Sequence, residues 1–152
     1  MNNEQLKEKI YSIDSTINIV EGKQYLELNV APEDLSKTAL MLKNNPDLSF
    51  DYLICLTGND LPDAYAVVYH LESTKHNHVV VLKVKAANRE NPTLDTVSNI
   101  WITADFHERE VYDLIGITFN NHPDMRRIFL DEEDWVGYPL RKDYTDNNIV
   151  VR

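Results

Sequence analysis

The densest group of ionisable side chains in this 152-residue chain is the run Asp-Phe-His-Glu-Arg-Glu-Val-Tyr-Asp at positions 105–113. Asp105, Arg109 and Asp113 recur every four residues, which on a helix places an acid, a base and an acid along one face. The neighbouring stripe would face the core and consists of Ala104, His107, Val111 and Leu114. Spacing alone favours a solvated ladder of ion pairs over a functional site, since each such pair stabilises a helix by only about 0.2–0.5 kcal/mol.

Two histidine patterns raise the question of a metal site. His107-Glu108 begins like a zinc-protease motif, but that motif needs a second His four residues on, where this chain has Val111. His76 and His78 lie one residue apart in a polar turn. With no Cys or further His nearby, we expect them to be solvated rather than metal ligands.

Catalysis by this chain alone has little support. Glu110 and Asp113 could act as paired carboxylates, but Arg109 beside them would hold their pKa values down. No Ser or Cys nucleophile and no Gly-rich phosphate loop accompanies them. A free-standing small-molecule enzyme using Glu110, Asp113 and His122 is therefore a distant alternative.

Two basic clusters follow the acidic run. The turn at 120–124 leads into Arg126-Arg127, and a second cluster occupies 139–143; Asp131-Glu-Glu-Asp134 and Trp135 lie between them. Arginines with aromatic neighbours are typical of a protein–protein interface. The alternative is self-neutralisation by the adjacent acids, and spacing cannot separate the two interpretations.

Composition narrows the class of protein. Apolar residues make up 43% and the net charge is −10, which predicts a globular core and argues against a general nucleic-acid binder. Arg supplies most positive charges after residue 100 and Lys most of those before it, so we expect the last third of the chain to make the contacts with other molecules.

Cys55 is the only cysteine and cannot by itself hold an iron–sulfur cluster. The first ten residues lack the apolar region of a secretory signal, and no apolar run is long enough to span a membrane, so we expect a soluble cytoplasmic protein.

Hydrophobic periodicity predicts an α+β fold. We expect helices at about 3–11, 32–43, 94–101 and 104–115, and strands at 16–20, 25–30, 50–56, 65–71 and 79–84. This order (α-β-β-α-β-β-β-α-α) predicts a two-layer sandwich with a mixed or antiparallel sheet of about five strands and helices on one face. From residue 116 the pattern is neither helical nor extended, so we expect an α+β domain at 1–115 and an extended irregular docking segment at 116–152.

Two stretches of the chain carry a family signature. Residues 104–130 and 135–144, from Ala-Asp-Phe-His-Glu-Arg-Glu to Arg-Lys-Asp-Tyr, resemble the C subunit of respiratory complex I, the NADH–quinone oxidoreductase. The resemblance implies an α+β domain with an extended tail. It further implies a non-catalytic subunit of the peripheral arm, supporting NADH-to-quinone electron transfer in a proton-pumping complex.

The resemblance also implies partners and a location. The chain would dock to the large subunit that forms the quinone site and to the small subunit that holds the terminal iron–sulfur cluster. It would bind no cofactor itself, since the iron–sulfur clusters, FMN and quinone belong to partner subunits. The complex would place it, as a peripheral protein, at the cytoplasmic face of the cell membrane. Related subunits occur in energy-converting membrane-bound hydrogenases and ferredoxin-linked complexes, which remain the main alternative.

The signature carries over to individual positions as expected interface residues. We expect Gly116 to end the helix as its C-cap, and the arginines to suit bidentate pairs across a subunit boundary. The matching positions are Glu108, Arg109, Glu110, Asp113, Gly116, His122, Pro123, Arg126, Arg127, Trp135, Gly137, Pro139, Leu140, Arg141, Lys142 and Asp143.

Overall fold

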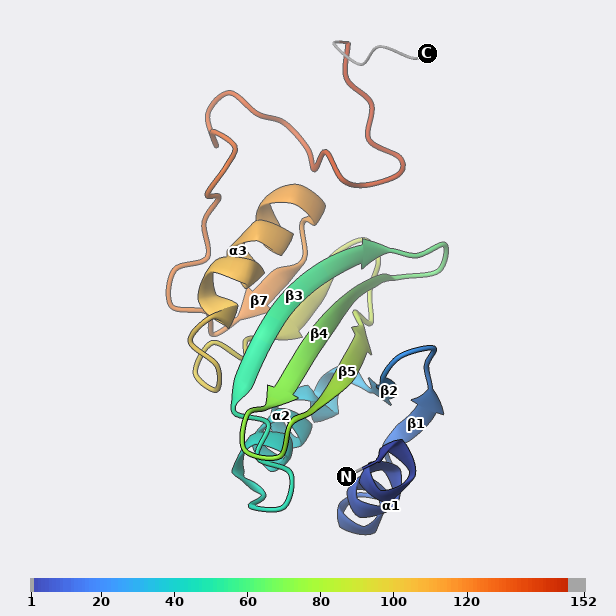
Figure 1. The fold of residues 1–152 in the computed structure, drawn as a ribbon. Coiled ribbons are helices and arrows are strands. Elements are labelled where there is room, and N and C mark those ends of the chain that lie inside the picture. Colours follow the sequence, from blue (N-terminus) through green and yellow to red (C-terminus); the bar gives the residue numbers. More distant parts are fainter. Residues whose placement is uncertain (1, 148–152) are drawn as a thin grey trace.

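The structure is a computed structural model that describes residues 2–147 (Figure 1). Its helices and strands lie between Asn3 and Asn120. In chain order they are α1 (Asn3–Ile13), β1 (Asn18–Glu21), β2 (Leu26–Val30), the 3-10 turn η1 (Pro32–Asp34), α2 (Leu35–Asn44), β3 (Tyr52–Asp60), β4 (Tyr65–Ser73), β5 (His78–Lys85), β6 (Thr93–Asp95), α3 (Ala104–Ile115) and β7 (Thr118–Asn120).

Five strands form the main sheet in the order β1-β2-β5-β4-β3. Only β2 and β5 run parallel among these neighbours, and the other three pairs are antiparallel. The alternation of side chains along β4 puts Val67, Tyr69 and Leu71 on the buried face. The predicted two-layer α+β sandwich with a mixed sheet and helices on one face is confirmed (Figure 1).

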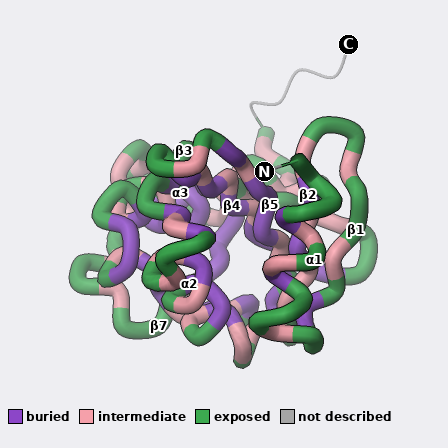
Figure 2. Tube along the Cα trace, turned by 60° about the horizontal axis from the view of Figure 1, so that its bottom comes forward, coloured by how far each residue is buried: buried purple, intermediate pink, exposed green. Residues whose placement is uncertain are grey.

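The core lies between this sheet and the helices, where the tube of Figure 2 is buried. Leu6 and Ile10 of α1 and Leu42 of α2 contribute to it with less than 2% of their surface exposed. Helix α3 packs closely on β3, because Gly58 has no side chain at the contact. A Cβ atom at Gly58 would lie 2.7 Å from Ile115 Cδ1 and 2.9 Å from Val111 Cγ1, so a side chain here would displace these two contacts.

Two of the predicted elements differ from the structure. The helix expected at 94–101 does not form; β6 lies there instead, followed by turns, and it pairs in parallel with β7 as a separate two-stranded sheet. The buried Glu108 carboxylate of α3 accepts a hydrogen bond from the Val97 N–H, so a tertiary contact replaces the hydrogen bond that a local helix would make. The third strand also does not stop at residue 56, since β3 continues to Asp60 along β4.

The longest described helix has 12 residues, so none of the described helices could span a membrane.

Ile117 and Phe119, which follow α3, are buried in the same core as the strands before it. After β7 the chain continues as the C-terminal segment (residues 121–147), which arcs over α3 (Figure 1). The last five positions of the expected docking segment, 148–152, lie outside the described residues.

Candidate functional site around helix α3

Asp113 is the main anchor of the C-terminal segment. Its carboxylate is fully buried, and Oδ2 accepts hydrogen bonds from three successive backbone N–H groups, those of Ile128 (3.1 Å), Phe129 (2.7 Å) and Leu130 (3.1 Å). Its other oxygen, Oδ1, lies 3.2 Å from Arg127 Nη1. A buried charge needs such partners, so one carboxylate fixes the path of four consecutive residues.

Arg127 continues this anchor across the segment. Its Nη2 donates to the Gly137 carbonyl at 3.0 Å, and its guanidinium lies 5.1 Å from the centre of the Tyr138 ring. The side chain therefore joins α3 to two separate parts of the C-terminal segment. Within residues 2–147, the guanidinium groups of Arg126 and Arg127 pair with Asp124 and Asp113 and not with the acidic run at 131–134. The contact to that run is a 3.3 Å hydrogen bond from the Arg127 backbone N–H to Glu132 Oε1.

Arg109, one turn before Asp113 on α3, also binds the C-terminal segment. It is 7% exposed, and its guanidinium donates to the carbonyls of Arg126 (3.2 Å) and Arg127 (3.4 Å). Its ion pair is with Asp124 at 3.7 Å. The solvated ladder that the sequence favoured is therefore wrong, because Arg109 and Asp113 are buried and bind the segment.

The predicted core stripe of α3 is half correct. Ala104 and Val111 are buried, whereas His107 and Leu114 are only partly so. The remaining buried positions include three ionisable residues, Glu108, Arg109 and Asp113. Amphipathic periodicity could not find these positions, since it counts charged residues as outward-facing.

Glu108 forms a second buried contact on α3, facing the loop after β6. Its Oε1 accepts the N–H of Val97 at 2.7 Å, and its Oε2 is hydrogen-bonded to the Thr96 hydroxyl. Oε2 also lies 3.8 Å from Nε2 of His122, a side chain with no exposed surface. Burial raises the pKa of Glu108 to about 7, and the two hydrogen bonds only partly offset this effect.

Gly116 ends α3 as predicted. It has φ 81°, and its N–H donates to the carbonyls of Tyr112 and Val111, so it is the left-handed C-cap. A Cβ atom here would lie 2.6 Å from the Tyr138 ring and 2.7 Å from Arg141 Nη2. Gly116 therefore serves both the helix end and the close approach of the C-terminal segment.

Arg141 occupies the space that Gly116 leaves open. Its Nε donates to the Ile115 carbonyl at 2.6 Å, satisfying an acceptor at the end of α3. Its guanidinium lies between two aromatic rings, 4.7 Å from the centre of Tyr65 and 4.4 Å from that of Tyr138. Such stacking suits the planar guanidinium, and Lys could not reproduce it.

Asp60, at the end of β3, holds the last part of the segment. It accepts from Lys142 N–H at 2.8 Å and from Arg89 Nη2 at 2.8 Å. Burial alone would raise the pKa of Asp60, but these hydrogen bonds outweigh it and keep this pKa below its usual value. No local pattern could have indicated this anchor, because Asp60 and Lys142 are 82 positions apart.

The signature positions divide into two groups in the structure. Seven are exposed, and the other nine are buried or half-buried. The exposed positions are Glu110, Pro123, Arg126, Trp135, Leu140, Lys142 and Asp143; the buried or half-buried positions are Glu108, Arg109, Asp113, Gly116, His122, Arg127, Gly137, Pro139 and Arg141.

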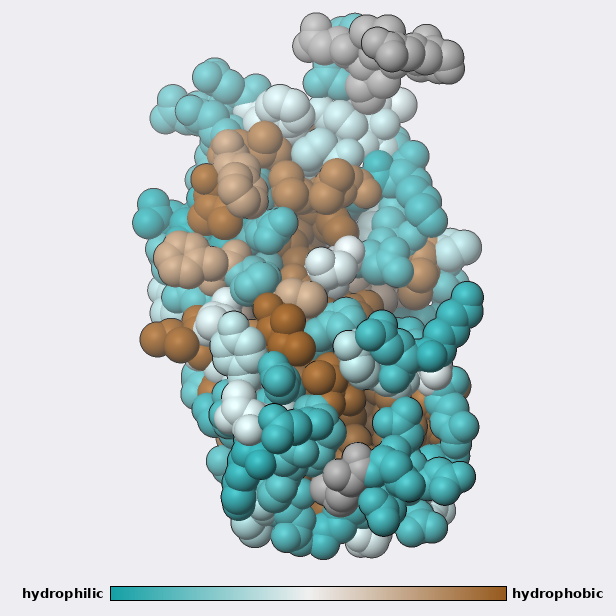
Figure 3. Space-filling view, in the orientation of Figure 1, coloured by the Kyte–Doolittle hydropathy of each residue, from teal (hydrophilic) through white to brown (hydrophobic). Residues whose placement is uncertain are grey.

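Large apolar side chains are exposed around α3. Leu140 is 59% exposed and Val136 87%, and Phe106 of α3 is 64% exposed. Leu140 N–H donates to the Leu114 carbonyl at 3.0 Å, which places this side chain beside α3. Figure 3 shows brown surface gathered over the α3 end of the molecule, whereas the α1 end is mostly teal. Contiguous exposed apolar surface is a common feature of interaction sites.

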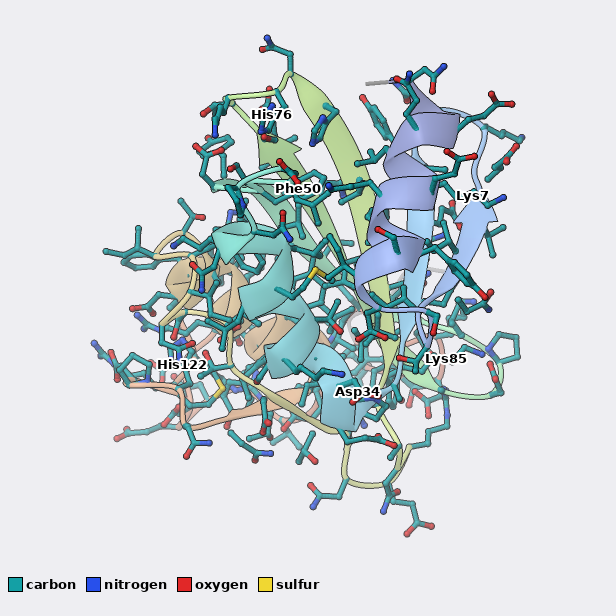
Figure 4. All side chains as sticks on the ribbon, turned by 90° about the horizontal axis from the view of Figure 1, so that it is seen from below. Lys7, Asp34, Phe50, His76, Lys85 and His122 are labelled. Atoms are coloured by element: carbon teal, nitrogen blue, oxygen red, sulfur yellow. The ribbon has the colours of Figure 1, made fainter. Side chains whose placement is uncertain are left out.

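The structure places the histidines of the polar turn differently from the sequence prediction. His78 is buried, and its Nε2 lies 3.3 Å from the Leu48 carbonyl, so its expected solvation is wrong. The His76 ring stacks on that of His78, and the Phe50 ring also contacts His78. Figure 4 labels His76 and Phe50. Within residues 2–147, no group of three or more His, Cys, Asp or Glu side chains could hold a metal ion.

The three residues of the enzyme alternative are not assembled into a site. Asp113 and His122 are bound to different backbone groups, and Glu110 is exposed. Glu110 instead lines a small pocket of about 50 Å³ together with Leu114 and Leu140.

The same fold is found in a chain of a solved respiratory assembly. That structure is of the membrane-bound sulfane sulfur reductase (MBS), an archaeal respiratory membrane complex. The match has a TM-score of 0.79 and covers 95% of this chain and 86% of the other, at 22% identity. This level of identity establishes likeness of fold only.

Sequence comparison identifies the family. Residues 28–148 match the family model described as "Respiratory-chain NADH dehydrogenase, 30 Kd subunit", and the chain belongs to this family. The C subunit of the NADH-quinone oxidoreductase of Roseiflexus castenholzii is 38% identical over 133 residues, which cover 86% of this chain and 75% of that protein.

Two further relatives are longer than this chain. The combined C/D subunit of the NADH-quinone oxidoreductase of Phocaeicola vulgatus is 52% identical over 108 residues, 70% of this chain and 21% of that protein. The C subunit of the same enzyme in Chloroherpeton thalassium is 48% identical over 108 residues, 70% of this chain and 44% of that protein. The matched part is therefore less than half the length of these two relatives.

Proposed function

We propose that this chain is a non-catalytic subunit of the peripheral arm of a proton-pumping NADH–quinone oxidoreductase. Its family membership and the names of its relatives support the complex, and these relatives are named as NADH–quinone rather than hydrogenase subunits. In this proposal the chain supports electron transfer by assembly and carries no cluster, flavin or quinone. The complex would hold it at the cytoplasmic face of the membrane.

The docking surface we propose consists of the outer side of α3 and the C-terminal segment. The observation that carries it is the direction of the side chains in that segment. Asp113 and Arg109 form hydrogen bonds with backbone groups of the segment. The side chains of Phe129, Val136 and Leu140 remain exposed. A segment with its polar backbone satisfied and its apolar side chains exposed suits burial by a partner.

The proposed partners are the large subunit of the quinone site and the small subunit that holds the terminal iron–sulfur cluster. Four relatives bear the combined name C/D, which supports a second subunit as the direct neighbour of this chain. The exposed signature residues, including Arg126, Trp135 and Lys142, would form the polar rim of the interface.

Co-purification from membranes tests the proposal. Val136→Glu and Leu140→Glu place a charge in the proposed interface and should strongly reduce recovery of the complex with this chain. Val20→Glu on β1 is the matched control, since Val20 is also exposed but lies on the α1 side of the molecule. Recovery of both interface variants at the wild-type level would refute the docking surface. A co-purifying electron-input subunit that does not oxidise NADH would refute the proposed donor.

A further inference from the structure

A second buried cluster joins α3 to the turn after β7. Glu108 has no exposed surface, and neither has the side chain of His122, which follows β7. Figure 4 labels His122 beside α3. His122 Nε2 lies 3.1 Å from the backbone carbonyl of Asp105, 3.2 Å from Asp105 Oδ1 and 3.8 Å from Glu108 Oε2.

The hydrogen bonds of His122 define its tautomer. The backbone N–H of Asp124 donates to Nδ1 at 3.0 Å. Since a backbone N–H can only donate, Nδ1 must offer its lone pair, and the proton of a neutral imidazole lies on Nε2. Nε2 then donates to Asp105, so every hydrogen bond of this ring is satisfied without a positive charge.

Glu108 therefore has no cationic partner. Within residues 2–147, no Lys or Arg nitrogen lies within 4.0 Å of its carboxylate, and the guanidinium of Arg109 is directed at the C-terminal segment. The other ionisable groups that face it are Asp105 on the same helix and Tyr69 of β4. The Tyr69 hydroxyl is buried with no hydrogen-bond partner among the described residues, so it does not donate to Glu108.

Thr96, in the loop after β6, can accept a hydrogen bond from a protonated Glu108 carboxyl. Thr96 Oγ1 lies within hydrogen-bond distance of Glu108 Oε2 and is also 2.8 Å from Ser98 Oγ. Thr96 has one hydroxyl proton and can donate it to only one of these oxygens. If Glu108 carries a proton and donates to Thr96, the Thr96 hydroxyl is free to donate to Ser98. A neutral carboxylic acid therefore satisfies the network.

We propose that Glu108 is a buried proton-binding site: its carboxyl is protonated in the folded chain, and loss of this proton opens the turn that carries His122. This inference goes beyond the docking function and does not depend on it. An ionised Glu108 would be a buried charge without a cation, which is strongly unfavourable in a protein interior. Contact with water would stabilise the ionised carboxylate. The turn that carries His122 lies between Glu108 and the surface, since its residues Asn121 and Pro123 are exposed. The raised pKa of Glu108, about 7, agrees with this arrangement.

Infrared spectroscopy of the full 152-residue chain tests the proton site directly. The C=O stretch of a protonated carboxyl should be present at about pH 6, where exposed acids are ionised, and should be lost by about pH 8.5. Glu108→Gln should remove this band, whereas Glu110→Gln, at the exposed position two residues on, should leave it unchanged. If Glu108→Gln folds and the spectra of both variants match the wild type, the proposal is wrong.

Nuclear magnetic resonance of the wild-type chain keeps the test independent of any variant. The nitrogen chemical shifts of His122 should show Nδ1 as the hydrogen-bond acceptor and Nε2 as the nitrogen that carries the proton. The Asp124 amide should exchange with solvent at least about tenfold faster at about pH 8.5 than at about pH 6 after correction for the intrinsic rate. A proton on Nδ1 of His122, or no change in corrected Asp124 exchange, would overturn the inference.

Discussion

Asp113 Oδ2 lies 2.7 Å from the backbone nitrogen of Phe129, and the N–H groups of Ile128 and Leu130 converge on the same oxygen. The acid belongs to the last turn of α3, whereas its donors are 15 to 17 positions further along the chain. A helix residue thus provides the acceptor that a segment without secondary structure of its own would otherwise lack. The proposed docking surface depends on this contact for its shape.

Asp113→Asn should destabilise the fold by about 2–4 kcal/mol, because a neutral amide accepts the three N–H groups less strongly and leaves Arg127 without its counter-ion. Urea unfolding followed by circular dichroism measures the loss. Glu110→Gln on the exposed face of the same helix is the control and should stay within about 0.5 kcal/mol of wild type. Equal stability of the two variants would refute the anchoring role of Asp113.

Gly116→Ala should destabilise the chain by about 2–4 kcal/mol, since the alanine combines positive φ with a Cβ contact at 2.6 Å. Gly137→Ala shares the positive φ but meets Tyr144 at 3.0 Å, so its loss should be nearer to about 1–2 kcal/mol. Thermal unfolding of both variants compares the helix end with the loop. A larger loss at Gly137 would contradict the close contact at Gly116.

Arg126→Ala should leave the isolated chain folded, because Arg126 is exposed and its ion pair with Asp124 is at the surface. Arg141→Ala should lower stability by about 2–3 kcal/mol, since it removes the stacked guanidinium and the donor to the Ile115 carbonyl. The family signature alone predicts interface roles for both. Chemical denaturation of the two purified variants separates them, and similar stabilities would show that Arg141 is not a structural contact.

The Glu108 carboxyl should make stability depend on pH. Its folded pKa of about 7 lies above its ordinary value of 4.5, so the folded state binds the proton more tightly than the unfolded state. This contribution is therefore fully present below about pH 4.5 and is lost as the pH rises through about 7. The loss should be on the order of 3 kcal/mol.

Denaturation across this pH range, compared between wild type and Glu108→Gln, measures the effect. The difference in free energy of unfolding between the two should shift in favour of the variant as the pH rises. A difference that stays constant from about pH 5 to about pH 8 would mean that Glu108 does not titrate in this range.

Much of the fold could be predicted because its signals are local. Alternation in β2, β4 and β5 and helical spacing from Ala104 to Ile115 are properties of neighbouring residues. Gly116 was predictable as a C-cap for the same reason. Residues 94–101 were not, because their backbone conformation depends on Glu108, which accepts the N–H of Val97 from another element.

Residue type and order were enough to predict the family, the α+β class and the set of signature residues. They could not determine which signature residues face a partner and which face the chain itself. Arg126 and Arg127 are adjacent and chemically identical, yet one is exposed and the other binds buried Asp113. Only tertiary structure decides this, because burial of a charge depends on what the fold places opposite it.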